Sequence, residues 1–130
     1  MFLQFANIDE RRKYGGSAFV ELQYCKLPTS TKLKKLVAVK SINNWQDDSL
    51  YIYLDDIDKF YTEYKDIFSG GIYGDLKTGD FDLNGINYYP QEQIIDIIEK
   101  IKTNKPLDYE TLLQWLSQNV NNDGIYILGI

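Results

Sequence analysis

The sequence of 130 residues contains no histidine, one cysteine and three prolines. The lack of histidine excludes Ser–His and Cys–His nucleophile pairs, imidazole zinc sites and acid–base catalysis by imidazole. The single cysteine, Cys25, excludes an intrachain disulfide and a thiolate metal cluster. No apolar run approaches the roughly 18 residues that a membrane-spanning helix needs, and no targeting segment is visible at the start. We therefore expect a cytoplasmic protein with no bound cofactor and no attachment to a membrane.

The sequence is rich in apolar and aromatic residues. Hydrophobic residues make up 44% of it and aromatic residues 15%, including eleven tyrosines. This composition is typical of a folded globular chain and not of a disordered one. The length fits one domain, since domains usually have roughly 100–200 residues. Because no repeat, low-complexity tract or flexible linker interrupts the sequence, we predict a single domain over residues 1–130.

Charge is distributed unevenly along the chain, whose formal net charge is −5. Residues 1–40 hold eight basic and three acidic residues, whereas residues 41–130 hold six basic and sixteen acidic ones. The acids are densest in residues 44–82, where ten face three bases. A field of this sign repels nucleic acid backbones and favours basic partners. We therefore expect no nucleic acid binding; the alternative is an acidic surface that only keeps the protein soluble.

Three segments have the residue pattern of strands, namely residues 17–24, 50–54 and 125–130. In the first, Val20 and Leu22 share one face and Glu21 and Gln23 share the other. The last has almost no polar face, which is typical of a strand that is central in its sheet or covered on both sides.

Three helices are predicted from apolar residues at helical spacing and from capping residues. They begin at Asp55 or Asp56, at Pro90 and at Asp108, and they end near Phe68, Asn104 and Val120. Residues 30–43 fit either a helix capped by Ser30 or Thr31 or a short strand, and we favour the helix.

The segment 72–89 is predicted to form a meander. Asn84-Gly85 is typical of a two-residue hairpin turn, which would pair Leu83 with Ile86 and Phe81 with Tyr88. With the other elements this predicts an α+β fold, in which a mainly antiparallel sheet with a central meander carries about three to four helices packed on one face.

The same turn partly matches a calcium-binding loop. Asp80, Asp82 and Asn84 would be ligands and Gly85 the turn glycine. The position of the bidentate glutamate is occupied by Gln91, however, and no helix precedes the loop. The hairpin explains these residues with fewer failures, so we predict no metal site.

Acidic and aromatic residues surround the predicted strand 50–54. The acids could cap a helix, bind a divalent metal or hydrolyse a glycoside. An aromatic patch rimmed by carboxylates also suits the binding of a basic protein, and an exposed tryptophan is a frequent anchor of such interfaces. The predicted protein-binding surface consists of Trp45, Asp47, Asp48, Tyr51, Tyr53, Asp55, Asp56 and Asp58.

Two segments carry a resemblance to one group of proteins, namely Arg12–Val20 (RKYGGSAFV) and Gly124–Ile130 (GIYILGI). Together with the short, acidic α+β domain that lacks a catalytic constellation, they give a chain that resembles the bacterial immunity proteins of polymorphic-toxin and contact-dependent growth-inhibition systems. The resemblance implies a cytoplasmic inhibitor that binds a cognate toxin domain, often a nuclease and commonly basic. It carries no individual site residue over to this chain.

We therefore expect an antitoxin that is not an enzyme, acts as a monomer or weak homo-oligomer, and binds a basic toxin through the surface named above. One alternative is a non-enzymatic protein-interaction module or a subunit of a larger complex. Another is a small metal-dependent enzyme that uses the acidic residues.

Overall fold

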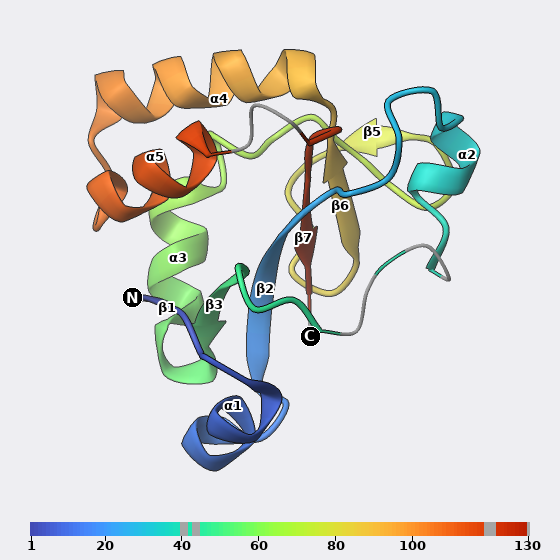
Figure 1. Ribbon diagram of the computed structural model, residues 1–130. Coiled ribbons are helices and arrows are strands. Elements are labelled where there is room, and N and C mark those ends of the chain that lie inside the picture. The colour runs from blue at the N-terminus through green and yellow to red at the C-terminus, as the bar shows by residue number, and fades with distance from the viewer. Residues whose placement is uncertain (40–41, 43–44, 119–121, 130) are drawn as a thin grey trace.

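The computed structural model describes residues 1–39, 42, 45–118 and 122–129 and places seven strands in one antiparallel sheet (Figure 1). The strands are β1 (Phe2–Leu3), β2 (Phe19–Tyr24), β3 (Leu50–Tyr53), β4 (Gly71–Ile72), β5 (Thr78–Gly79), β6 (Ile86–Tyr89) and β7 (Ile125–Leu128). Their order across the sheet is β1-β3-β2-β7-β6-β4-β5. The described residues also form the helices α1 (Ile8–Gly15), α2 (Leu33–Leu36), α3 (Ile57–Tyr64), α4 (Gln91–Asn104) and α5 (Tyr109–Ser117), and a 3₁₀ turn, η2 (Leu54–Asp56). The fold is thus α+β, as predicted.

Strand β7 lies at the centre of the sheet, between β2 and β6, which confirms the prediction made from its apolar sequence. Its residues Ile125 and Ile127 are fully buried and oppose Tyr24 and Leu22 of β2. Tyr126, on the other face of the strand, is buried as well, so the strand without a polar face lies where both of its faces are covered.

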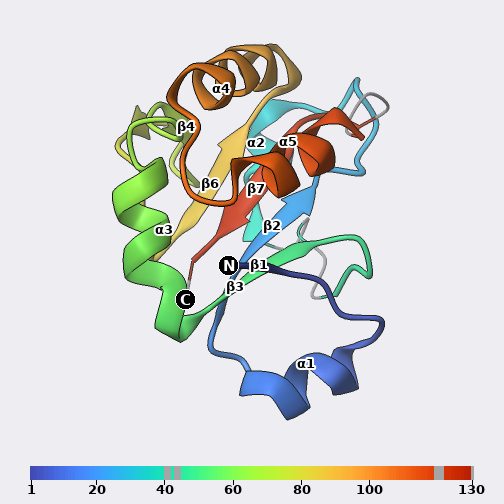
Figure 2. The same cartoon turned by 90° about the vertical axis from the view of Figure 1, so that its left-hand side faces the viewer.

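The first face of the sheet is covered by α3, α4 and α5. Figure 2 looks onto this face, with α3 and α5 in front of the strands and α2 behind them. Its apolar core combines strand residues such as Val20 and Ile52 with Phe60 of α3, Ile97 of α4 and Trp115 of α5. These helix residues lie on the apolar stripes that the spacing predicted.

On the second face, α1 packs near one end of the sheet and α2 near the other. At the α1 end, Phe5 packs against Phe19 and Tyr51, with ring centroids 5.5 Å apart in both pairs. At the α2 end, Leu36 packs with Tyr88 and Tyr126. The expectation that all helices pack on one face was therefore wrong, because large aromatic side chains on the second face also need cover.

The predicted hairpin at Asn84-Gly85 does not form. Phe81 and Leu83 lie outside the strands, and Tyr88 pairs with Ile72 of β4 and Tyr126 of β7. The reason is the buried side chain of Asn87, whose Nδ2 donates hydrogen bonds to the carbonyl oxygens of Asp82 at 2.7 Å and Ile127 at 3.1 Å. These bonds hold residues 81–85 in a loop. Strand β6 therefore pairs with β7 and β4 and not with the predicted hairpin strand.

The helix favoured within residues 30–43 is the single turn α2. It begins after Lys32 and not after Ser30 or Thr31, and Lys32 provides no side-chain cap. Residues 40, 41 and 43 of this range lie outside the described residues, as do Val120 and Ile130 at the ends of two other predicted elements.

Helix α1 was not predicted, although the sequence carries a signal for it. The side chain of Asn7 accepts a hydrogen bond from the backbone N–H of Glu10 at 3.0 Å, and Glu10 Oε2 accepts one from the N–H of Ala6 at 3.0 Å. This reciprocal pair is a close variant of the capping box. The polar sequence of α1, which buries no residue fully, hides the helix from a search for apolar periodicity.

Candidate functional site

The eight residues of the predicted binding surface lie along β3 and beyond both of its ends. Trp45, Asp47 and Asp48 precede the strand, Tyr51 and Tyr53 are on its second face, and Asp55, Asp56 and Asp58 follow it in η2 and the first turn of α3. Because β3 is four residues long and a strand rises about 3.3 Å per residue, the strand keeps the two acidic groups roughly 13 Å or more apart along its direction.

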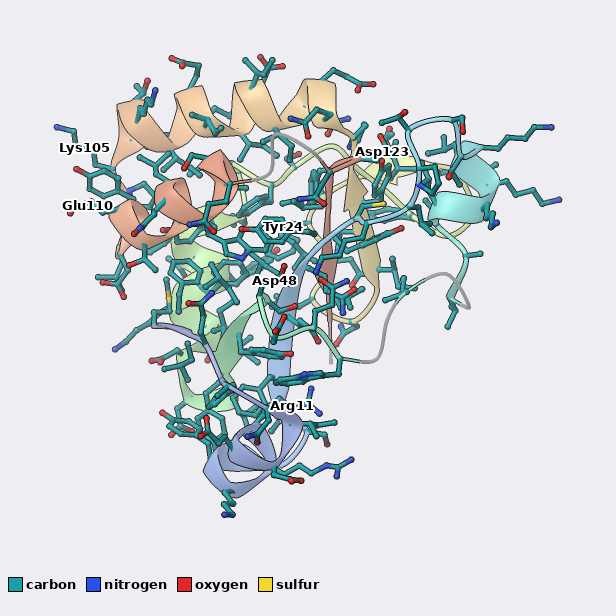
Figure 3. All side chains as sticks on the ribbon, viewed as in Figure 1. Arg11, Tyr24, Asp48, Lys105, Glu110 and Asp123 are labelled. Atoms are coloured by element: carbon teal, nitrogen blue, oxygen red, sulfur yellow. The ribbon has the colours of Figure 1, made fainter. Side chains whose placement is uncertain are left out.

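Trp45 is held by stacking. Its ring lies parallel to that of Tyr51, with centroids 5.7 Å apart and an interplanar angle of 15°. The guanidinium carbon of Arg11 from α1 lies 5.5 Å from the Trp45 ring centre and 5.6 Å from that of Tyr51. Arg11, labelled in Figure 3, thus provides a cation–π contact to the aromatic pair, a role that the sequence did not suggest.

Tyr51 itself is only 1% exposed, so it supports Trp45 from beneath and offers a partner almost no surface. Tyr53, at the other end of the strand, is half-buried against Tyr14 of α1, with ring centroids 5.3 Å apart. Tyr14 is 55% exposed and was not predicted for the surface. The aromatic part of this surface is therefore formed by Trp45, Tyr53 and Tyr14.

Asp48 is held in place by two contacts with other parts of the chain. Its Oδ2 forms an ion pair with Lys26 Nζ at 2.8 Å, and its backbone oxygen accepts a hydrogen bond from Trp115 Nε1 at 2.7 Å. The Trp115 ring in turn stacks on Tyr24, with ring centroids 4.1 Å apart. Burial, with the nearby Asp48 charge as a smaller cause, raises the pKa of the Tyr24 hydroxyl. Asp48 thus ties the start of β3 to α5.

The other four acids have no such partner. Within the described part of the chain, none of Asp47, Asp55, Asp56 and Asp58 forms an ion pair. Asp56 occupies the N-cap position of α3, but its side chain makes no capping hydrogen bond. Capping therefore does not account for these carboxylates, although acids near a helix N-terminus still interact favourably with its dipole.

A buried carboxylate beside Tyr51 was missed by the sequence analysis. Glu21, 8% exposed, opposes Tyr51 across the β2–β3 pair. Its Oε2 accepts hydrogen bonds from Ser49 Oγ and Gln23 Nε2, both at 2.8 Å. Burial raises the pKa of Glu21 above its usual value, while these hydrogen bonds and the Arg11 charge oppose that rise. Glu21 and Gln23 alternate with apolar residues, a pattern that indicates a solvent-facing side of the strand. In the structure both side chains are buried.

We expect Glu21→Gln to stabilise the protein more strongly at high pH than at low pH. A carboxyl whose pKa is raised by folding contributes stability below its unfolded pKa and loses it as the pH rises through the folded value. The wild type therefore carries the cost of the buried charge at about pH 8 and is relieved of it at about pH 4. Urea unfolding of both proteins across this range measures the difference, with Glu110→Gln, at an exposed position of α5, as the control for losing one negative charge. A Glu21→Gln effect that does not change with pH would contradict the assignment.

The calcium-loop residues have a local explanation. Asp82 Oδ1 accepts a hydrogen bond from the N–H of Asn84 at 2.9 Å, which closes an Asx turn. Among residues 1–39, 42, 45–118 and 122–129, no three acidic or cysteine side chains come together as metal ligands would.

Comparison with protein-family models, with curated proteins and with solved structures found no match to this chain. In the described residues, no helix combines the length and the hydropathy that crossing a membrane requires. The arguments for function therefore rest on the residues of this surface alone.

Proposed function

We propose that this chain is an immunity protein, which binds a cognate bacterial toxin domain and neutralises it without catalysing a reaction. The observation that carries the proposal is the set of unpaired acids around β3. Asp47, Asp55 and Asp58 are exposed, and none of them forms an ion pair with a residue in the described part of the chain. Carboxylates arranged in this way complement a basic surface, such as that of a nuclease domain.

The geometry suggests separate roles for the acids and the aromatic residues. The acids would steer the basic toxin towards this face, which raises the rate of association. Trp45 and Tyr53 would provide the apolar contacts, since half-buried aromatic rings lose little conformational entropy on binding. Tyr51 and Arg11 would hold Trp45 in place from behind. Covering the toxin's substrate surface would then inhibit it.

A charge-reversal variant tests the steering role. Changing Asp47, Asp55 and Asp56 together to lysine should lower the association rate constant for the toxin domain by about 10-fold or more at low salt, and should weaken its dependence on salt. Asp48 is left unchanged because it pairs with Lys26. The probe is an inactivated form of the toxin domain that the proposed function expects a neighbouring gene to encode, and the rates are read by surface plasmon resonance.

The matched control changes three exposed acids on other helices, Asp96, Glu99 and Glu110, to lysine, so that the net charge changes equally. If the association rate constant falls equally in both triple variants, the net charge steers the toxin and the surface around β3 does not. If the toxin domain fails to bind the wild type, the alternative of a different protein-interaction module replaces the immunity function.

A further inference from the structure

A hollow of about 400 Å³ lies beside α3, next to the connection between α4 and α5. It is lined by Asp58, Lys59, Thr62, Glu63 and Leu107, and we call it the α3 hollow. Figures 1 and 2 show the α4–α5 connection descending beside α3. Leu107, at the centre of this connection, is 43% exposed, so an apolar side chain faces solvent inside an acidic rim.

The walls of the α3 hollow are fixed to each other. The buried hydroxyl of Tyr64 in α3 donates a hydrogen bond to the Leu107 carbonyl oxygen at 2.6 Å. The next residue, Asp108, forms an ion pair with the amino group of Met1 at 3.0 Å. Pro106 is buried, and its carbonyl oxygen accepts a hydrogen bond from the N–H of Tyr109 at 3.1 Å. The exposed Leu107 is therefore held in a preformed position, which lowers the entropy that a partner's binding would cost.

The charges around the hollow are unbalanced. Neither Asp58 nor Glu63 forms an ion pair with another residue that the structure describes. Lys59 provides one positive charge at the rim, but its aliphatic stem can line the hollow while its ammonium group stays in water. Just outside the lining, exposed Asp55 and Asp66 are balanced by exposed Lys65 and Lys105, so the negative charge of the hollow comes from its own lining, which has two acids and one base. The opening thus attracts cations, while its floor favours an apolar group.

We propose that the α3 hollow receives a basic segment of the partner, with one large apolar side chain seated against Leu107 and flanking lysines or arginines beside Asp58 and Glu63. This inference rests on the proposed function in taking the toxin as the partner. It extends that function by adding Glu63 and Leu107 to the surface and by specifying the chemistry of the segment that binds there.

Two probes test the inference separately from the proposed function. The first is a helical peptide of lysine and leucine at amphipathic spacing, with a glutamate–leucine peptide of the same pattern as its control, titrated into ¹⁵N-labelled protein. We expect the lysine peptide alone to shift the amide signals of Thr62, Glu63 and Leu107. The second probe is the inactivated toxin domain that the proposed function expects a neighbouring gene to encode.

Two matched pairs of variants are compared with both probes. Leu107→Arg should weaken binding by about 10-fold or more, whereas Ile95→Arg, at a 65% exposed position of α4, should not. Likewise, Asp58→Lys with Glu63→Lys should weaken binding more than Asp96→Lys with Glu99→Lys.

The outcomes separate the two claims. If the toxin domain binds wild type and Leu107→Arg equally, or if the lysine peptide shifts α4 signals as much as those of the hollow, the inference is overturned. If the toxin domain does not bind at all but the peptide maps to the hollow, the immunity function fails and the hollow stands as a site for basic segments.

Discussion

Trp115→Ala is expected to lower the free energy of unfolding by about 3–5 kcal/mol, the usual cost of removing a large buried aromatic side chain. The Trp115 ring is 3% exposed and stacks on Tyr24 with centroids 4.1 Å apart and an interplanar angle of 11°. Its Nε1 is also the donor that holds the Asp48 carbonyl oxygen at 2.7 Å. The substitution therefore opens a cavity in the first-face core and releases the segment that begins the proposed binding surface.

Trp115→Phe separates these two effects. Phenylalanine keeps an aromatic ring near Tyr24 but has no donor for the Asp48 carbonyl, so it should cost less than alanine, about 1–3 kcal/mol. Urea denaturation followed by far-UV circular dichroism gives both values. Equal losses for the alanine and phenylalanine variants would show that the hydrogen bond, and not the packing, dominates at this position.

Gly124→Ala is expected to destabilise the fold by about 2–5 kcal/mol through a backbone clash. Gly124 has a φ of 93°, in the region that side chains rarely adopt. A Cβ atom there would lie 2.1 Å from the Tyr89 carbonyl oxygen and 3.0 Å from the Pro90 Cα. Because both atoms belong to the backbone where β6 passes into α4, the junction itself must move. The shift also disturbs the hydrogen bond from the N–H of Cys25 to the Gly124 carbonyl oxygen.

Gly16→Ala is the matched control, because it shares the positive φ but not the clash. Gly16 has a φ of 65°, and a Cβ there would meet no atom within 4 Å. This variant should lose only about 1–3 kcal/mol, the cost of holding a side chain in a sparsely populated backbone conformation. Thermal unfolding of both variants gives the comparison, and a loss at Gly16 as large as that at Gly124 would exclude the clash as the cause.

Much of the fold follows from local pattern. The apolar sequence 125–130 predicted the central strand, and apolar residues at helical spacing after Pro90 predicted α4, whose buried residues are Ile94, Ile97 and Ile101. These predictions hold because each segment contains enough apolar surface to determine its own face. The start of α5 after Asp108 followed from its capping residue in the same way, although the Asp108 side chain pairs with Met1 and does not cap the helix.

Other features depend on contacts between distant segments, which no local pattern reveals. The Asn84-Gly85 turn favoured a hairpin, yet the hydrogen bond from Asn87 to Ile127, forty residues away, helps to hold the loop in a different form. Glu21 has the pattern of a solvent-facing residue but is buried by Ser49 and its neighbours. The sequence also could not show that α1 would bring Arg11 under the aromatic pair.

The candidate site was predictable in its charge but not in its accessibility. The unpaired acids Asp47, Asp55 and Asp58 are exposed, as the density of charge suggested. Tyr51 is buried, because α1 and Phe5 cover the face on which it lies. Whether a side chain on a strand meets solvent depends on what packs over that face, and the sequence of the strand does not contain this information.

Growth rescue tests the central claim most directly. The toxin domain that the proposed function expects a neighbouring gene to encode is expressed in a bacterial host with this chain, with the Asp47, Asp55 and Asp56 triple lysine variant, or with neither. The account predicts that the domain alone stops growth, that wild type restores it, and that the triple variant restores it less than the matched Asp96, Glu99 and Glu110 variant does. A toxic domain that stops growth equally with and without the wild-type chain would contradict the immunity function.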